Sequence, residues 1–560
     1  MAVINHKAER GNDVKRVKDS GHSRKVVAAG PGTGKSYLFS EIIKQKRAQG
    51  KTKFLAITFI GKLSDALADD LCGLARTTTM HSFARSFVLE HAKGWTYYPQ
   101  IYDLIAEDLK NEGVEAFEIG DEHYVNKTKY YKAVGDADVV HYAVRICKKD
   151  PKKIPVFDLI LVDEYQDFNA AESEFVDLLA QRNETIIVGD DDQALYGFKG
   201  SSPSFIREKY DSGNTNWESF SLRFCSRCTE VMIKYFHSLV AQLTPSNPAE
   251  GDPSKRRIEK EYICYAPDGE PDSKTEDSKA NPTIHLIKSC PVGMIAYKIK
   301  EKLEKLVETQ KVKEVLVIGE ARSCMALLKT TAQQLKNYGF KNVDNKGEVG
   351  IISVRQSIVD AYRFLAKDGS SLLGWRILGN PSDEEARKRS LKNAKTLNAI
   401  INGTPSEVKA ISYARILLME DEIESWETLS KELDGDDMDA SDVEALKHHE
   451  QDIVIRKGLL TQELKRANLH LPPPLCNLEI TVCNILNSKG LGADVVFLIG
   501  FDQGKFPSKG SPTDDEIYQM MVAVTRAKKR MYLINTIDKK VSGFIDCLDA
   551  RHLDIEEIKA

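Results

Sequence analysis

Residues 26–36 read V-V-A-A-G-P-G-T-G-K-S, and this stretch decides the fold of the N-terminal half of the chain. The apolar residues predict a short strand, the glycines predict a tight turn, and the stretch from Lys35 to about residue 48 is typical of a helix. A strand, a glycine-rich turn and a helix that opens with Lys-Ser form the context of a P-loop, whose backbone N–H groups cradle phosphate. The sequence therefore predicts a nucleoside triphosphate site.

Each residue type in this loop has an expected task. The glycines permit the curl of the backbone around a phosphate. The Lys35 ammonium is expected to reach the β- and γ-phosphates, and the Ser36 hydroxyl to ligate Mg²⁺. The expected nucleotide-binding residues of the loop are Gly30, Gly32, Thr33, Gly34, Lys35 and Ser36.

A second apolar run, L-I-L-V at residues 159–162, ends in Asp163 and Glu164. A nucleoside triphosphatase needs a carboxylate on the metal side and a group that orients water. We expect Asp163 to hold Mg²⁺ through water and Glu164 to act as the base. An acidic pair at a strand end is often only a solvated surface feature, but the Tyr-Gln-Asp that follows at residues 165–167 argues against that interpretation here.

Short β-rich runs alternate with helical stretches in two parts of the chain. This alternation is typical of a parallel sheet with crossover helices, so we expect an α/β fold with two lobes. The runs lie at residues 26–29, 54–58, 157–162 and 185–188 in the first series, and at 315–318, 495–499 and 531–534 in the second.

Two long stretches have little strand pattern and are expected to be helical insertions, one in each lobe. The expected first lobe comprises residues 1–83 and 155–212, with the insertion at 84–154. The expected second lobe comprises residues 213–365 and 476–560, with the insertion at 366–475.

Composition excludes several classes of protein. The 560 residues are too many for one hydrophobic core. The net charge, 79 − 83 = −4, excludes a protein held on DNA by bulk positive charge, although a local basic groove remains compatible with it. No apolar run approaches the roughly 20 residues of a membrane span, and the N-terminus has no apolar signal core. The single C-x-x-C at residues 225–228 does not favour a zinc site, and we expect a cytoplasmic protein with reduced thiols.

The motifs resemble, in order, those of the UvrD/Rep-like superfamily 1 DNA helicases. D-E-Y-Q-D-F-N at 163–169 resembles motif II, V-G-D-D-D-Q-A-L-Y-G-F-K-G at 188–200 resembles motif III, and V-A-V-T-R-A-K-K at 522–529 resembles motif VI. Residues 54–66 resemble motif Ia, and residues 79–83 the motif after it. The resemblance implies two RecA-like P-loop lobes with parallel sheets, each with a mostly helical insertion, and ATP with Mg²⁺ between the lobes.

The resemblance also implies roles for residues of both lobes. Gln193 would sense the γ-phosphate, Arg526 would be an arginine finger, and Arg227 matches the arginine of motif IV. Lys489 and Gly490, in N-S-K-G-L, resemble motif V and would contact the nucleotide. Cations from the far lobe would meet the γ-phosphate only when the cleft closes, which would couple hydrolysis to closure.

A path for single-stranded DNA across the lobes is implied in the same way. Tyr196 and Phe198 match the motif III aromatics, and periodicity alone favours core packing for any one aromatic. Because both flank Gly197 in a polar turn, we expect them to be exposed and Phe198 to stack on a base. The implied DNA-contacting residues are Thr58, Phe59, Lys62, His81, Ser82, Tyr196 and Phe198.

The chain departs from the family mainly around the nucleoside. Residues 1–35 contain no glutamine that could read adenine, Ser226 stands where the family has a stacking tyrosine, and Gly492 stands where it has a glutamate. Two interpretations stay open: loose base preference, or a pocket rebuilt from Phe224, Phe220 or the N-terminal residues. Three further departures affect positions expected to act in DNA binding. Asn484 stands in place of a threonine, Leu486 in place of a histidine, and Lys199 in place of an arginine.

These observations predict a DNA-dependent ATPase that translocates on single-stranded DNA and unwinds duplex DNA, with 3′→5′ polarity implied by the resemblance. Its expected partners are single-stranded DNA and duplex DNA with a single-stranded tail. The first alternative is a DNA-activated ATPase switch that senses strands or ends and works with a partner nuclease. The second is a nucleotide-binding scaffold, against which the intact Lys35, Glu164 and Arg526 argue.

Overall fold

The structure is a computed structural model, and the parts of the chain that it describes carry two parallel sheets. The described residues are 6–197, 200–243, 257–265, 283–345, 360–379 and 477–558, apart from gaps of one or two residues inside these ranges and together with a few isolated positions. Most of the second expected insertion, residues 366–475, lies outside them.

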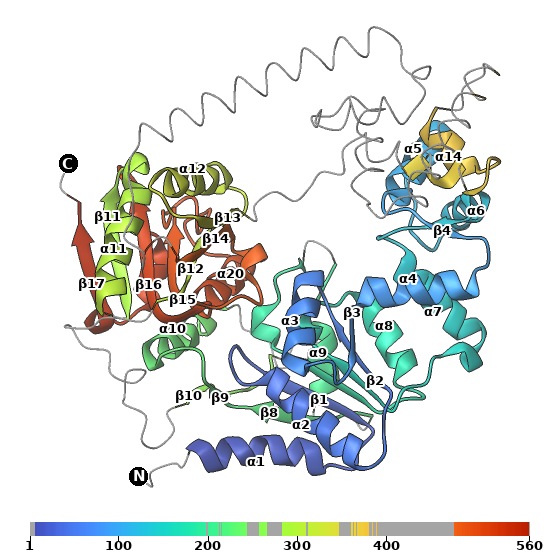
Figure 1. Cartoon of the computed structure of the whole chain (residues 1–560), viewed down its shortest axis with the longest axis horizontal. Helices are drawn as coiled ribbons and strands as arrows, with labels where there is room; N and C mark the ends of the chain where they lie inside the picture. The colour runs from blue at the N-terminus through green and yellow to red at the C-terminus, as the bar shows by residue number, and fades with distance from the viewer. Residues whose placement is uncertain are drawn as a thin grey trace. The chain divides into compact units, whose positions relative to one another are not determined.

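The first sheet has six strands in the order β3-β2-β6-β7-β1-β8, all parallel (Figure 1). Its central strands are buried along their whole length, as expected for a sheet covered by helices. On one face the core is formed with α1, α2 and α3. The strands are β1 (Arg24–Ala29), β2 (Phe54–Thr58), β3 (Arg76–Thr79), β6 (Leu159–Val162), β7 (Thr185–Gly189) and β8 (Glu218–Leu222), and the helices are α1 (His6–Asp19), α2 (Lys35–Ala48), α3 (Gly61–Leu71), α4 (Met80–His91), α7 (Val139–Lys149), α8 (Ala170–Leu179) and α9 (Ser204–Tyr210).

The position of β8 corrects one expected boundary. β8 pairs with β1 in parallel register, with Val27 opposite Phe220. The first sheet therefore continues to Leu222, past the boundary expected at residue 212. The reason is topological: after α9 the chain returns to the open edge of β1 before it leaves for the second lobe.

The second sheet has seven parallel strands in the order β13-β14-β12-β15-β16-β11-β17. Alternate residues of β12 face opposite sides, so that α11 and α12 cover one face while α10 and α20 cover the other. The strands are β11 (Ile284–Cys290), β12 (Glu314–Gly319), β13 (Asn342–Asn345), β14 (Glu479–Asn484), β15 (Ala493–Ile499), β16 (Ala527–Thr536) and β17 (Leu553–Glu557), and the helices are α10 (Glu230–Val240), α11 (Ile295–Thr309), α12 (Met325–Asn337) and α20 (Asp514–Val524).

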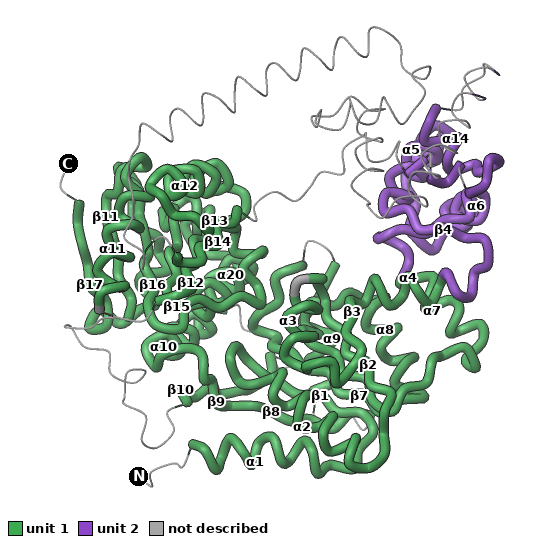
Figure 2. The backbone as a smooth tube through the Cα atoms, in the orientation of Figure 1, with its two compact units in different colours: residues 1–88, 140–347, 469–560 green, residues 89–139, 348–468 purple. Residues whose placement is uncertain are grey.

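The expected α/β class with two parallel-sheet lobes is confirmed. Figure 2 shows that both sheets belong to one compact unit, which comprises residues 1–88, 140–347 and 469–560. The second unit comprises residues 89–139 and 348–468. Among the described residues no helix is both long and apolar enough to cross a bilayer.

The second unit joins stretches that are far apart in the sequence. Tyr98, Ile105 and Tyr124 of the first stretch form an apolar cluster with Leu373 of the second. Arg376 donates from Nε to Asp108 Oδ1 at 2.8 Å. The two insertions, expected as separate elements, thus share a core in their described parts. The elements of this unit are β4 (Thr96–Tyr97), α5 (Ile101–Asn111), α6 (Glu122–Tyr131), β5 (Ala133–Val134) and α14 (Leu372–Ile377).

Candidate functional site

The P-loop connects β1 to α2 as the sequence predicts. Gly32 and Gly34 have φ angles of 68° and 93°, in the left-handed region that glycine adopts without strain. The buried Thr33 hydroxyl donates to the Gly30 carbonyl at 2.9 Å. The loop is thus fixed in part by its own residues, and its junction with α2 is the helix N-terminus at which an anion would bind.

Residues from two later segments, Ser226, Arg227 and Tyr262, also contact the P-loop. The backbone N–H and the hydroxyl of Ser226 both donate to the Gly32 carbonyl, at 2.8 and 2.9 Å. A Cβ on Gly32 would collide with Arg227, and a Cβ on Gly30 would overlap the ring of Tyr262. Ser226, at the position of the family's stacking tyrosine, therefore binds the loop backbone instead.

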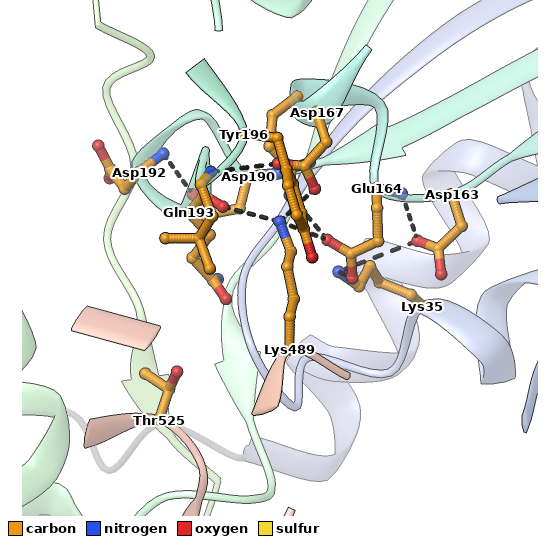
Figure 3. Close-up of polar contacts among 12 residues, drawn as sticks. Lys35, Asp163, Glu164, Asp167, Asp190, Asp192, Gln193, Tyr196, Lys489 and Thr525 are labelled. Carbon is orange, nitrogen blue, oxygen red and sulfur yellow. Dashed lines mark hydrogen bonds and ion pairs between the residues drawn. The ribbon is translucent and has the colours of Figure 1, made fainter. Parts of the chain in front are cut away.

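Lys35 contacts both acidic residues that follow β6 (Figure 3). Its Nζ lies 2.7 Å from Glu164 Oε1 and 3.9 Å from Asp163 Oδ1. Burial raises the pKa of the Asp163 carboxyl to about 6, although Lys35 opposes this shift. Burial would also raise the pKa of Glu164, but Lys35 and Lys489 outweigh it and hold that pKa well below its ordinary value. Glu164 is therefore an ionised carboxylate between two lysines.

Glu164 is also tied to the loop after β7. Its φ of 53° is unusual for a residue with a side chain. Its Oε2 accepts a hydrogen bond from Gln166 Nε2 at 2.7 Å, and Gln166 Oε1 accepts from the Asp190 N–H at 3.0 Å. Gln166 thus links the base candidate to the start of the motif III loop by two hydrogen bonds.

Lys489 reaches this network from the other lobe. It follows the short 3₁₀ helix at Leu486–Ser488, and its side chain is 2% exposed. Its Nζ pairs with Asp167, donates to the Gln193 carbonyl at 2.8 Å and lies 3.7 Å from Glu164 Oε2. Lys489 was expected to contact nucleotide; here its charge is directed at carboxylates of the first lobe.

Arg526 and Gln193 meet across the lobes. Arg526 Nη2 lies 3.5 Å from Gln193 Oε1, and its Nε and Nη1 donate to the carbonyls of Val522 and Leu491, each at 3.0 Å. Burial, with the nearby charge of Arg227, lowers the pKa of Arg526 to about 9, so that it remains a cation at neutral pH. An arginine held by its own lobe is thus directed at the glutamine of the other.

One cavity of about 130 Å³ is lined by the expected metal and catalytic residues and by part of the expected phosphate loop; Gly30, Thr33 and Gly34 do not line it. Residues from α3 line it as well, which the sequence did not suggest. The lining residues expected from the sequence are Gly32, Lys35, Ser36, Asp163, Glu164, Gln193, Arg227, Lys489, Gly490 and Arg526.

Three of the residues expected to contact DNA are buried or partly buried. Tyr196 was expected to be exposed, and that is wrong: it is 7% exposed, because its ring packs 4.7 Å from that of Phe59 and beside Lys489. Thr58 is fully buried, and its hydroxyl has no hydrogen-bond partner among the described residues. Phe59 is partly buried. A role of these residues at DNA stays a prediction.

The remaining DNA candidates lie at the start of α4 and near α3. His81 is half-buried, with Nδ1 3.4 Å from Glu172 Oε1, and the hydroxyl of Ser82 accepts a hydrogen bond from that of Thr79 at 2.9 Å. Lys62 belongs to α3, but its side chain is not among those described. Phe198 and Lys199 lie outside the described residues.

Sequence reasoning missed the residues that bind the motif III aspartates. Lys260 forms ion pairs with Asp190, Asp191 and Asp192, and Arg257 forms one with Asp192. No motif marks them. The available signal was the triplet D-D-D itself, because carboxylates at the end of a buried strand require cations nearby.

Phe224 was one of two expected replacements for the missing tyrosine. It is 1% exposed and packs against His6 and Tyr265, at ring-centroid distances of 5.3 and 6.4 Å. A buried ring in this position cannot stack on a base without rearrangement. Arg10, whose guanidinium lies 4.5 Å from the centroid of Tyr265, approaches Gly34 from α1.

Comparison with known proteins agrees with this geometry. Residues 106–213 match the UvrD/REP helicase N-terminal domain, and residues 420–537 match the UvrD-like helicase C-terminal domain. Parts of both halves of the chain are therefore similar to the two domains of UvrD/Rep-like helicases.

Individual relatives match over short stretches. The exonuclease/helicase subunit RexA of Lactococcus lactis subsp. cremoris (strain MG1363) is 27% identical over 169 residues, 29% of this chain and 14% of that protein. The ATP-dependent DNA helicase Rep of Buchnera aphidicola subsp. Acyrthosiphon pisum is 37% identical over 91 residues, 15% of this chain and 14% of that protein. The matches thus span about one seventh of these relatives.

Proposed function

We propose that the protein is an ATP-dependent motor that translocates on single-stranded DNA in the 3′→5′ direction and unwinds duplex DNA with a single-stranded tail. The observation that carries this proposal is the single cavity in which Lys35, Glu164 and Gln193 of the first lobe meet Lys489 and Arg526 of the second. A site built from two lobes can convert nucleotide binding and hydrolysis into relative motion of the lobes.

The residues fit Mg²⁺ with a triphosphate. Ser36 and Asp163 both line the cavity and offer the oxygen ligands that Mg²⁺ prefers. Bound there, Mg²⁺ would neutralise charge on the phosphate oxygens. Lys35 would hold the β- and γ-phosphates, and Glu164 would orient and deprotonate the attacking water.

Nucleotide entry requires a rearrangement. The cavity of about 130 Å³ is smaller than the roughly 300–1,000 Å³ of common ligand pockets. Lys35 is also paired with Glu164 at 2.7 Å. An incoming triphosphate draws Lys35 away and frees Glu164 for water. Binding and activation of the base are thereby coupled.

Arg526 and Arg227 would stabilise the transition state of hydrolysis. Gln193 orients the γ-phosphate from the first lobe, while Arg526 and Arg227 supply positive charge from the far side of the cavity. Such cations stabilise the transition state most when they are already held in place. Arg526 is held in this way by two carbonyls of its own lobe.

A second candidate is a DNA-activated ATPase switch that senses strands or ends and works with a partner nuclease. The observation that favours it is the burial of Tyr196, which leaves fewer aromatic faces for the stacking that a motor uses to grip bases. The name of the relative from L. lactis, which describes an exonuclease/helicase, suggests the partner.

Two assays on the full chain separate the candidates. ATP hydrolysis is measured with and without single-stranded DNA, and strand displacement is measured on duplexes with a 3′ or a 5′ tail, with Lys35→Ala as the inactive control. A motor displaces strands from the 3′-tailed duplex only. A switch hydrolyses ATP in response to DNA but displaces neither. Hydrolysis that ignores DNA would refute both.

A further inference from the structure

Three consecutive carboxylates at the end of β7 are fully buried. Asp190, Asp191 and Asp192 each have no exposed surface, and their oxygens lie within 4.8 Å of one another. Burial of a carboxylate is costly unless the charge is paired. Such a group resembles a metal site, but a cation of the chain itself lies among the three.

That cation is Lys260. Its Nζ lies 3.1 Å from Asp190 Oδ1 and 2.8 Å from Asp192 Oδ2, and it pairs with Asp191 as well. Its side chain is 1% exposed. Burial alone would lower the pKa of Lys260, but the three carboxylates hold it above its ordinary value, so the ammonium stays charged.

Two arginines complete the network, and they contact different carboxylates. Arg257 binds both oxygens of Asp192, with Nε at 2.5 Å and Nη2 at 2.6 Å. Arg207 donates from Nε to Asp191 at 2.8 Å. In the described part of the chain, Lys260 is the cation that contacts Asp190.

Asp190 connects this network to the reaction. Its Oδ1 faces Lys260. Its Oδ2 accepts a hydrogen bond from Gln193 Nε2 at 2.5 Å (Figure 3). With Nε2 held there, the other end of the Gln193 amide faces Arg526 and the cavity. The charge on Lys260 thus fixes a carboxylate that in turn fixes Gln193.

We infer that Lys260 is a positioning residue for nucleotide hydrolysis, which acts through Asp190 on the side-chain amide of Gln193. This inference rests on the proposed function. Without the ammonium, Asp190 loses the cation that holds it in place, and Gln193 loses its fixed orientation. Displacement of a catalytic group by about 1 Å can cost about a hundredfold in rate.

The segment that carries Lys260 has a second contact with the nucleotide site. We call residues 257–265 the strap. Its strand β10 (Ile263–Cys264) pairs with β9 (Phe224–Cys225), and its Tyr262 packs against Gly30 of the P-loop. The strap therefore touches both the phosphate loop and the carboxylate that orients Gln193.

The test compares Lys260→Met with Arg257→Met in the full chain under saturating single-stranded DNA. Both variants lose a cation that pairs with Asp192, but only the first loses the cation that contacts Asp190. Lys260→Met is expected to lower kcat about 10- to 100-fold with KM and ADP affinity little changed. Arg257→Met is expected to stay within about threefold of the wild-type kcat. A wild-type kcat in Lys260→Met would overturn the inference.

A double-mutant cycle separates positioning from general damage. In a Gln193→Ala background, Lys260→Met should cause no further loss of kcat, because the group it orients is absent. If the double variant instead loses kcat by the product of the two single losses, the inference is overturned. If Lys260→Met does not fold, Asp190→Asn replaces it in the same cycle, with the same two outcomes. A wild type that hydrolyses no ATP would instead refute the proposed function.

Discussion

Replacement of Glu164 by Gln is expected to tighten nucleotide binding while it slows hydrolysis. Lys35 must leave the Glu164 carboxylate, 2.7 Å away, before it can hold phosphates. A hydrogen bond to a charged group contributes about 1.5–3 kcal/mol net. Glutamine has nearly the same shape but no charge, so most of this stabilisation of the nucleotide-free state is lost. The corresponding gain in affinity is roughly 10- to 140-fold.

Titration calorimetry with ADP and a non-hydrolysable ATP analogue measures the gain in affinity. Steady-state turnover measures the effect of losing the base, which is expected to lower kcat about 10²- to 10⁴-fold. Glu41→Gln is the matched control, because that carboxylate pairs with Lys18 and Lys44 at the surface of α2. It should change neither quantity. Unchanged or weaker binding in Glu164→Gln would refute the competition between Glu164 and phosphate, and normal turnover would refute its role as the base.

Three further outcomes are expected. Arg526→Ala should lower kcat about 10³- to 10⁵-fold with ADP affinity retained, as measured by turnover and equilibrium binding. Because Ser226 is bound to the P-loop and Gly492 has no side chain, kcat/KM for ATP, GTP and CTP should agree within about tenfold, whereas a hundredfold preference for ATP would reveal an adenine pocket. Burial raises the pKa of Asp138 to about 6, so its contribution to stability is present below its ordinary pKa and is lost as pH rises through about 6. Asp138→Asn should therefore raise Tm above that of the wild type at pH 8 but not at pH 4, as followed by thermal unfolding.

The strands that sequence predicted are those with continuous apolar runs. β2, β6 and β15 lie inside their sheets, where both faces are covered and nearly every side chain is apolar. The strands that it missed include β3 and β13, which read R-T-T-T and N-V-D-N. Both lie at sheet edges, where pairing with one neighbour requires no apolar pattern.

The residues of the site also divide into those that sequence predicts and those that it does not. Lys35, Asp163 and Glu164 were predictable because each lies in a short motif directly after a strand. Lys260 was not, because it meets Asp190 only through the fold and carries no local signal. The burial of Tyr196 was missed for a related reason: its neighbours Phe59 and Lys489 come from distant segments.

The glycines of the P-loop are required for two different reasons. Gly32 and Gly34 adopt backbone angles that disfavour side chains, whereas Gly30 leaves room for the ring of Tyr262 in the strap. Substitution at Gly30 is therefore constrained by a partner far along the chain. In a set of related sequences, positions 30 and 262 should covary: an alanine at the first should accompany a smaller residue at the second, while positions 32 and 34 should remain glycine whatever stands at 262.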